Sequence, residues 1–205
     1  KCERCLDSPQ GKMERGVPRK LVEASLKSKV FVIGQALGPK TQKLTGLPYT
    51  LTDGSLSQTG KALDLFLNRF CCTIDSGGRT GYVYSSDMIQ CYPGQGRGGD
   101  RKPTCQELRN CLPWMMEELN IIKPEIIVLL GRLAAKIFFQ KYLGLKFEGK
   151  KMWGKQYRFG EIDVFAVPHP SYRRRKPAEV DPIYDEAARR IAPRTGQYPK
   201  TRQND

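Results

Sequence analysis

Residues 29–34 read KVFVIG, with four consecutive apolar residues between a lysine and a glycine. A short apolar run that ends at a turn residue is typical of a strand buried on both faces of a parallel sheet. The pattern returns in EIIVLLG at residues 125–131, and runs rich in β-forming residues occupy residues 82–89 and 162–168. The sequence therefore predicts four strands.

Helical patterns separate these runs. Residues 61–67 carry apolar side chains at helical spacing, and we expect this helix to begin near Thr59. Two more helices are predicted over residues 106–122, ahead of Pro124, and over residues 132–139. Alternating strands and helices predict an α/β fold, with a mostly parallel sheet covered on both faces. Ligands of such sheets bind beyond the carboxyl ends of strands, so residues following the first, second and fourth strands are the site candidates.

The size of the chain, 205 residues and 23.2 kDa, is that of one domain. We expect residues 1–205 to form a single domain, with a frayed tail from Ala192 onward because that segment is polar. No segment has the roughly 20 consecutive apolar residues that a membrane span needs, and no apolar secretory segment opens the sequence. These features predict a cytoplasmic protein.

The chain is strongly basic. Lysine and arginine number 35 against 21 aspartates and glutamates, which gives a formal net charge of +14. Such an excess attracts polyanions and raises their rate of encounter. The composition therefore points to nucleic acid as the partner, and an exposed basic surface without a specific partner is the alternative.

Seven cysteines are spread along the chain. Cys2 and Cys5 form a C-x-x-C pair, while Cys91 follows a predicted strand and Cys111 lies in a predicted helix. Two thiolates from one tight turn and two from distant elements can build a tetrahedral site, for zinc or an iron-sulfur cluster. Cys105 competes with Cys111 for the fourth position. Buried thiols without a metal are the alternative, chiefly for Cys71, Cys72 and Cys105.

His169 is the only histidine of the chain, so any chemistry that needs an imidazole depends on it. It directly follows the fourth predicted strand and lies between Pro168 and Pro170, which would hold it rigidly at the ligand-binding edge of the sheet. The basic run at residues 173–176 comes next, and its side chains can bind phosphates. A structural histidine followed by an exposed charged turn is the alternative.

Seven motifs follow one another along the chain: C-x-x-C at residues 2–5, strand-G-x-x-x-G ending at 38, G-x-P-aromatic at 46–49, strand-x-x-x-Cys ending at 91, Cys-x-P-aromatic at 111–114, strand-G-R-x-A-A ending at 135, and HPS-Tyr at 169–172. In this order they resemble the uracil-DNA glycosylase superfamily, most closely its iron-sulfur branch, family 4. The likeness extends from Cys2 to about Pro177, and the HPS-Tyr motif and the distributed cysteines are its specific parts.

This resemblance implies a three-layer α/β/α sandwich with a four-stranded, mostly parallel central sheet. It also implies a DNA glycosylase of base excision repair that carries a 4Fe-4S cluster and hydrolyses the N-glycosidic bond of uracil. We expect such an enzyme to be a nucleoid-associated monomer that binds single- or double-stranded DNA with one base flipped out of the stack.

The resemblance also assigns roles to individual residues. Cys2, Cys5, Cys91 and Cys111 would bind the cluster, Gly34, Gln35 and Ala36 would contact the flipped base, and Ser171, Arg173, Arg174 and Arg175 would hold flanking phosphates or wedge the helix open. Cys111 is preferred to Cys105 because it begins the Cys-x-Pro-aromatic motif. Tyr49 would stack on the base, and His169 would donate a hydrogen bond to the pyrimidine O2.

The sequence departs from the family pattern at the first motif and the second strand. The acidic residue of the first motif is Gln35, and Pro39, Lys40 and Thr41 replace the acidic residues that usually follow, so no water-orienting carboxylate remains in that loop. The expected asparagine of the second strand is Asp87. An ionised carboxylate only accepts hydrogen bonds, whereas a protonated one can also donate, to uracil or to cytosine. We therefore expect a shift of base preference toward cytosine or a modified pyrimidine, or a role for Asp87 in orienting water.

Two other classes of protein fit the same residues. One is a non-catalytic iron-sulfur DNA-binding protein on a glycosylase fold, which the missing carboxylates favour. The other is an RNA-binding module held together by zinc, which the cysteine spacing permits.

Overall fold

The computed structural model describes residue 5 and residues 23–75, 83–96 and 99–195. Its centre is a five-stranded sheet in the order β2-β1-β5-β7-β6. The strands are β1 (Val30–Ala36), β2 (Tyr84–Ile89), β5 (Ile126–Leu130), β6 (Gln156–Phe159) and β7 (Ile162–Val167). The first four neighbours in this order pair in parallel, and β6 pairs antiparallel with β7.

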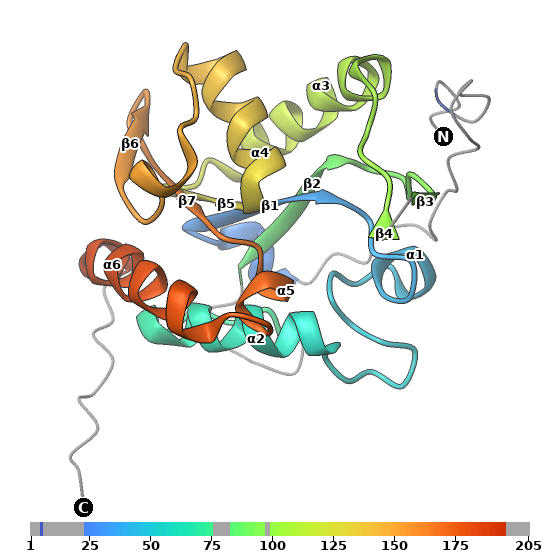
Figure 1. Ribbon diagram of the computed structural model, residues 1–205, viewed down its shortest axis with the longest axis horizontal. Helices are drawn as coiled ribbons and strands as arrows, with labels where there is room; N and C mark the ends of the chain where they lie inside the picture. The colour runs from blue at the N-terminus through green and yellow to red at the C-terminus, as the bar shows by residue number, and fades with distance from the viewer. Residues whose placement is uncertain (1–4, 6–22, 76–82, 97–98, 196–205) are drawn as a thin grey trace, which may run out of the picture.

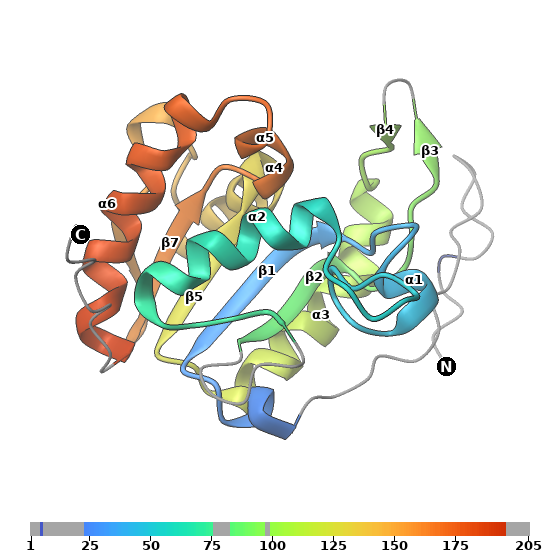
Figure 2. The same cartoon turned by 90° about the horizontal axis from the view of Figure 1, so that it is seen from below.

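Helices cover both faces of the sheet, which confirms the α/β/α sandwich (Figure 1). Helices α3 (Cys105–Ile122) and α4 (Gly131–Phe138) lie on one face, and α2 (Gln58–Leu67) and α6 (Pro177–Thr195) lie on the other, as Figure 2 shows from below. Strand side chains alternate between the two apolar cores. In β1, Phe31 and Ile33 enter the core under α3 and α4, whereas Val30 and Val32 enter the opposite core.

Short elements connect these helices and strands. They are η1 (Glu23–Lys27), α1 (Gln42–Thr45), η2 (Asn68–Phe70), β3 (Gln95–Gly96), β4 (Gly99–Asp100), the π-helical η3 (Phe139–Leu143), η4 (Gly149–Lys151) and α5 (Pro170–Arg173). Strands β3 and β4 form a separate two-stranded hairpin.

The boundaries of α3 have clear local causes. Thr104 caps its amino end by accepting from the backbone N–H of Glu107, and the Glu107 carboxylate accepts from the backbone N–H of Thr104. Glu107 is fully buried and also pairs with Arg101 at 2.6 Å. The helix ends where Lys123 adopts a left-handed conformation directly before Pro124, as the sequence predicts.

Three expectations need correction. The sheet has five strands instead of four, because β6 adds an edge strand to β7. Strand β1 does not end at Gly34 but continues to Ala36. The tail does not fray from Ala192, because α6 continues to Thr195; Ala192 is buried and the Thr195 hydroxyl donates to the Phe70 carbonyl at 3.3 Å.

In the described part of the chain, none of the helices combines the length and the apolar character that crossing a membrane requires.

Candidate active site

A cavity of about 1700 Å³ lies at the carboxyl edge of the sheet. Strand β2 lies on one side of β1 and β5 on the other, so the direction of strand crossover reverses between β1 and β5. This reversal opens a crevice where ligands of parallel sheets bind. The cavity is lined there by Gln35 and Ala36 of β1, Asp87 of β2, Gly131 after β5 and His169 after β7. The sequence prediction that the site lies at this edge is consistent with this cavity.

His169 is held by the backbone of the turn that it begins. It is the N-cap of α5, and its Nδ1 accepts the backbone N–H of Ser171 at 3.2 Å and lies 2.8 Å from the Ser171 hydroxyl oxygen. Because a backbone N–H can only donate, Nδ1 carries no proton, and the proton of the neutral ring is on Nε2. The site therefore contains a neutral imidazole with one N–H donor.

Burial keeps this imidazole neutral. Desolvation lowers the pKa of His169 to about 4, because removal of water disfavours the charged form. At neutral pH the ring is therefore a hydrogen-bond donor without a positive charge.

Asp87 is the buried acidic group of the cavity. It lies opposite Gly34 in the parallel pairing of β1 and β2, and only 6% of its surface is exposed. A Cβ atom added to Gly34 would overlap Asp87 Oδ1. Gly34 itself does not line the cavity, whereas the next two residues, Gln35 and Ala36, do. The glycine thus makes room for the carboxylate.

Tyr49 is held in a left-handed backbone conformation, with φ of 58°. Its carbonyl accepts the backbone N–H of Ser57, the N-cap of α2, at 2.8 Å. Its hydroxyl oxygen lies 3.4 Å from the position that a Gly34 Cβ would take. Burial, and next the charge of Asp87, raise the pKa of Tyr49. The hydroxyl therefore stays protonated beside the base-contacting residues that the sequence predicts.

The end of β5 also contributes to the cavity, which the sequence analysis missed. Leu130, Gly131 and Arg132 line it, although only the ends of the first, second and fourth strands were named as candidates. Gly131 has a φ of +86°, and a Cβ there would lie 3.0 Å from the Cβ of His169. The rule applied to the other strands would have found this strand end as well.

Basic side chains outnumber acidic ones in the cavity wall. Its basic side chains are Lys40, Lys102, Arg132, Lys136, Lys146, Arg174 and Arg175, and its acidic ones are Asp87 and Asp100. None of these seven cations forms an ion pair with another residue that the structure describes. An excess of unpaired positive charge in a concave site attracts phosphates.

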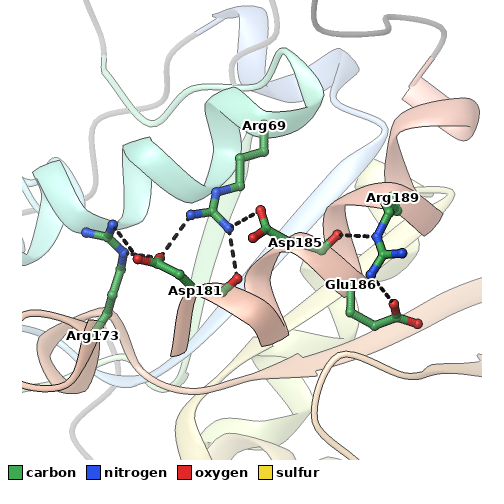
Figure 3. Close-up of polar contacts among 6 residues, drawn as sticks. All are labelled: Arg69, Arg173, Asp181, Asp185, Glu186 and Arg189. Atoms are coloured by element: carbon green, nitrogen blue, oxygen red, sulfur yellow. Dashed lines mark hydrogen bonds and ion pairs between the residues drawn. The ribbon is translucent and has the colours of Figure 1, made fainter. Parts of the chain in front are cut away.

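Of the four residues predicted to bind DNA, three line this cavity: Ser171, Arg174 and Arg175. Arg173 does not line it. Figure 3 shows Arg173 turned toward Asp181 of α6, where its Nε donates at 2.7 Å and one terminal nitrogen at 3.1 Å. Two hydrogen bonds to one carboxylate fix the orientation of a guanidinium, so Arg173 is held against α6.

Three of the six described cysteines lie at one apolar cluster, and the other three lie elsewhere. Cys5 and Cys111 belong to one apolar cluster with α3, Cys91 packs against that cluster, and the Asn110 amide donates to Cys5 Sγ at 3.1 Å. Cys105 is exposed, so its interpretation as a buried thiol was wrong, whereas Cys72 is buried and Cys71 half-buried. Cys2 lies outside the described residues. Among those residues, no three Cys, His, Asp or Glu side chains are grouped closely enough to hold a metal ion.

The fold and its site define a class: an α/β/α protein whose switch-point cavity combines one neutral imidazole with cations that pair with no carboxylate in the described part of the chain, a combination suited to chemistry on a nucleic acid. The chain belongs to the uracil-DNA glycosylase superfamily, since the sequence model of that family matches residues 22–191.

Relatives support the same assignment. The chain is 32% identical over 149 residues to a Type-5 uracil-DNA glycosylase of Pyrobaculum aerophilum, covering 71% of this chain and 62% of that protein. It is 27% identical over 161 residues to a Type-4 uracil-DNA glycosylase of the same organism, covering 76% and 73%. A Type-4 enzyme of Saccharolobus solfataricus is 25% identical over 187 residues, covering 89% and 78%.

Proposed function

We propose that this protein is a monofunctional DNA glycosylase that hydrolyses the N-glycosidic bond of a pyrimidine flipped out of DNA. The observation that carries the proposal is the neutral His169 ring, whose Nε2–H is the donor in a cavity lined by cations that pair with no carboxylate of the described residues. The three relatives described above are named uracil-DNA glycosylases, which supports the same reaction.

The chemistry follows from the charges that develop. When the bond between C1′ and the base nitrogen breaks, its electron pair moves to the base and negative charge grows on O2. A fixed N–H donor such as His169 Nε2 stabilises this charge more than it stabilises the intact nucleotide. Water adds to C1′ and loses a proton, and the released base gains one, so the reaction consumes one water molecule.

Asp87 determines which base is accepted in this proposal. Among the described residues it is one of two carboxylates in the cavity wall, and it is the one on the central sheet, in β2, because the other, Asp100, lies in β4 of the separate hairpin. As an ionised group it would accept an N–H of the base or orient the attacking water, and as a protonated group it would also donate to O4 of uracil or N3 of cytosine. Base preference can therefore extend to cytosine or a modified pyrimidine.

The test is release of free base from labelled oligonucleotides that contain uracil, cytosine or a 5-substituted pyrimidine. We compare the wild type with His169→Ala and Asp87→Asn on single and double strands. Release by the wild type, and its loss in His169→Ala, supports the proposal. If the wild type and Asp87→Asn both release uracil alone, and to the same extent, Asp87 does not determine the base preference. Binding without release by the wild type identifies a non-catalytic DNA-binding protein on the same fold.

We also propose that Cys2, Cys5, Cys91 and Cys111 hold a 4Fe-4S cluster. Cys5 and Cys111 share one apolar cluster and Cys91 packs against it, and the amide of Asn110, the neighbour of Cys111, donates to Cys5 Sγ. These observations support the ligand set, because hydrogen bonds to sulfur tune such clusters. When bound, the cluster would cross-link the N-terminal segment to α3. Iron and acid-labile sulfide analysis distinguishes it from zinc.

A further inference from the structure

Two contacts from α6 lie on either side of His169. Before it, the Tyr184 hydroxyl donates to the Pro168 carbonyl at 2.9 Å, in a buried position. After it, Asp181 accepts two hydrogen bonds from Arg173, the last residue of α5. The turn that carries His169 is thus fixed to α6 at both ends.

Asp181 is itself held from a third element. Arg69 of η2 donates to Asp181 Oδ1 at 2.9 Å and, with its other terminal nitrogen, to the Asp181 carbonyl at 3.1 Å and to Asp185 at 2.6 Å (Figure 3). The Arg69 guanidinium also lies 5.7 Å from the centre of the Tyr184 ring. The side chains of Arg69, Arg173 and Asp181 are only 20–30% exposed. Partial burial makes such a network stiffer and less screened than a surface pair.

We propose that Asp181, acting through Arg173, and Tyr184 are positioning residues that hold the His169 imidazole in its catalytic orientation. Arg173 then belongs to this network and not to the DNA-binding surface. Its sequence neighbours differ in this respect, since Arg174 and Arg175 line the cavity and pair with no carboxylate of the described residues.

The first measurement needs neither DNA nor activity. Because His169 is the only histidine, an imidazole ¹⁵N NMR spectrum reports on it alone. In the wild type we expect one resonance set with the proton on Nε2. In Asp181→Asn and Tyr184→Phe we expect exchange broadening or a mixture of tautomers. Glu186→Gln is the matched control, because Glu186 lies on the same helix and pairs only with Arg189 (Figure 3) and with Arg190 among the described residues. Its spectrum should equal that of the wild type.

The second measurement rests on the proposed glycosylase function. Under single-turnover conditions, Asp181→Asn should lower the rate constant of base release roughly tenfold to hundredfold, as small misplacements of catalytic groups do. Its Kd for DNA should stay unchanged, and Asp181→Glu should recover part of the rate. Arg174→Ala should instead weaken DNA binding and leave the His169 spectrum unchanged.

Two results would overturn the proposal. One is a wild-type His169 spectrum in both Asp181→Asn and Tyr184→Phe. The other is an Arg173→Gln variant that weakens DNA binding as much as Arg174→Ala and keeps the wild-type spectrum. A changed spectrum in a protein that releases no base would support the positioning role and reject the glycosylase function, so the two failures are distinguishable.

Discussion

The carboxylate of Asp87 occupies the space in which any side chain at position 34 would begin. Gly34 has an ordinary strand backbone, without a positive φ, so the cost of an alanine there comes from this overlap and not from backbone strain. The absence of a side chain at Gly34 therefore leaves the space that the Asp87 carboxylate of the neighbouring strand occupies.

Gly34→Ala should destabilise the protein by about 1–3 kcal/mol, as overpacking does, and should abolish base release by displacing Asp87. Urea denaturation measures the stability. In the double variant with Asp87→Ala, the two costs should not add, because the second change removes the overlap. Strictly additive costs would contradict the contact.

Stability should fall as the pH falls through the range in which only the unfolded chain protonates His169. The unfolded imidazole has an ordinary pKa of 6.5 and the folded one a pKa of about 4. Between these values the unfolded state binds one more proton, so the contribution is fully present above pH 6.5 and is lost toward pH 4. It amounts to at most about 3 kcal/mol. His169→Gln should lack this part of the pH dependence, as measured by urea denaturation between pH 7 and pH 4. A titration of the wild-type imidazole near pH 6.5 would contradict the desolvated site.

DNA affinity should depend on salt through the cations of the cavity. Lys136→Ala should reduce the slope of log K against log salt by about one, as loss of one phosphate contact does. Arg190→Ala should leave the slope unchanged, because Arg190 pairs with Glu186 on α6. Fluorescence anisotropy at several salt concentrations makes the comparison. Equal slopes for all three proteins would show that DNA does not enter this cavity.

Cys111→Ser should lose bound iron, and Cys105→Ser should retain it. The two cysteines lie on the same helix, but Cys111 is buried in the apolar cluster that also contains Cys5, whereas Cys105 is exposed. Iron content and visible absorbance give the answer. The reverse pattern would assign Cys105 as the ligand, and zinc in place of iron would reject the cluster.

Glu107→Ala should destabilise the fold by about 3–5 kcal/mol, because it leaves Arg101 without its partner in a position that is only 13% exposed. Thr104→Ala removes the helix cap alone and should cost about 1 kcal/mol. Thermal or urea unfolding compares them. Similar small costs for both variants would show that the Arg101 charge is well solvated.

The sequence predicted the parallel strands and their helices because continuous apolar runs and helical spacing are strong local signals. It also placed His169 at the carboxyl edge of the sheet, since that edge follows from strand direction, whereas Asp87 was singled out through the resemblance to the glycosylase family. It missed β6, a short edge strand whose side chains alternate between exposed and half-buried. The two-residue connection Gly160-Glu161 between Phe159 and Ile162 is the local hairpin signal for this strand.

Other features could not be predicted from local patterns. Arg173, Arg174 and Arg175 are chemically identical in sequence, and only the position of Asp181 on α6 separates the first from the others. The extension of α6 to Thr195 likewise depends on burial of Ile191 and Ala192 against the sheet, which a polar composition does not reveal.

The order of the strands has a consequence for how the protein matures during synthesis. Strand β1 leaves the ribosome first but needs β2 on one side and β5 on the other, and the imidazole follows β7, more than a hundred residues later in the chain. A nascent chain that has folded only its first three parallel strands thus presents cationic side chains to nucleic acid before its imidazole is in place. Under the proposed function, such a chain would bind DNA but release no base until the last strand has formed.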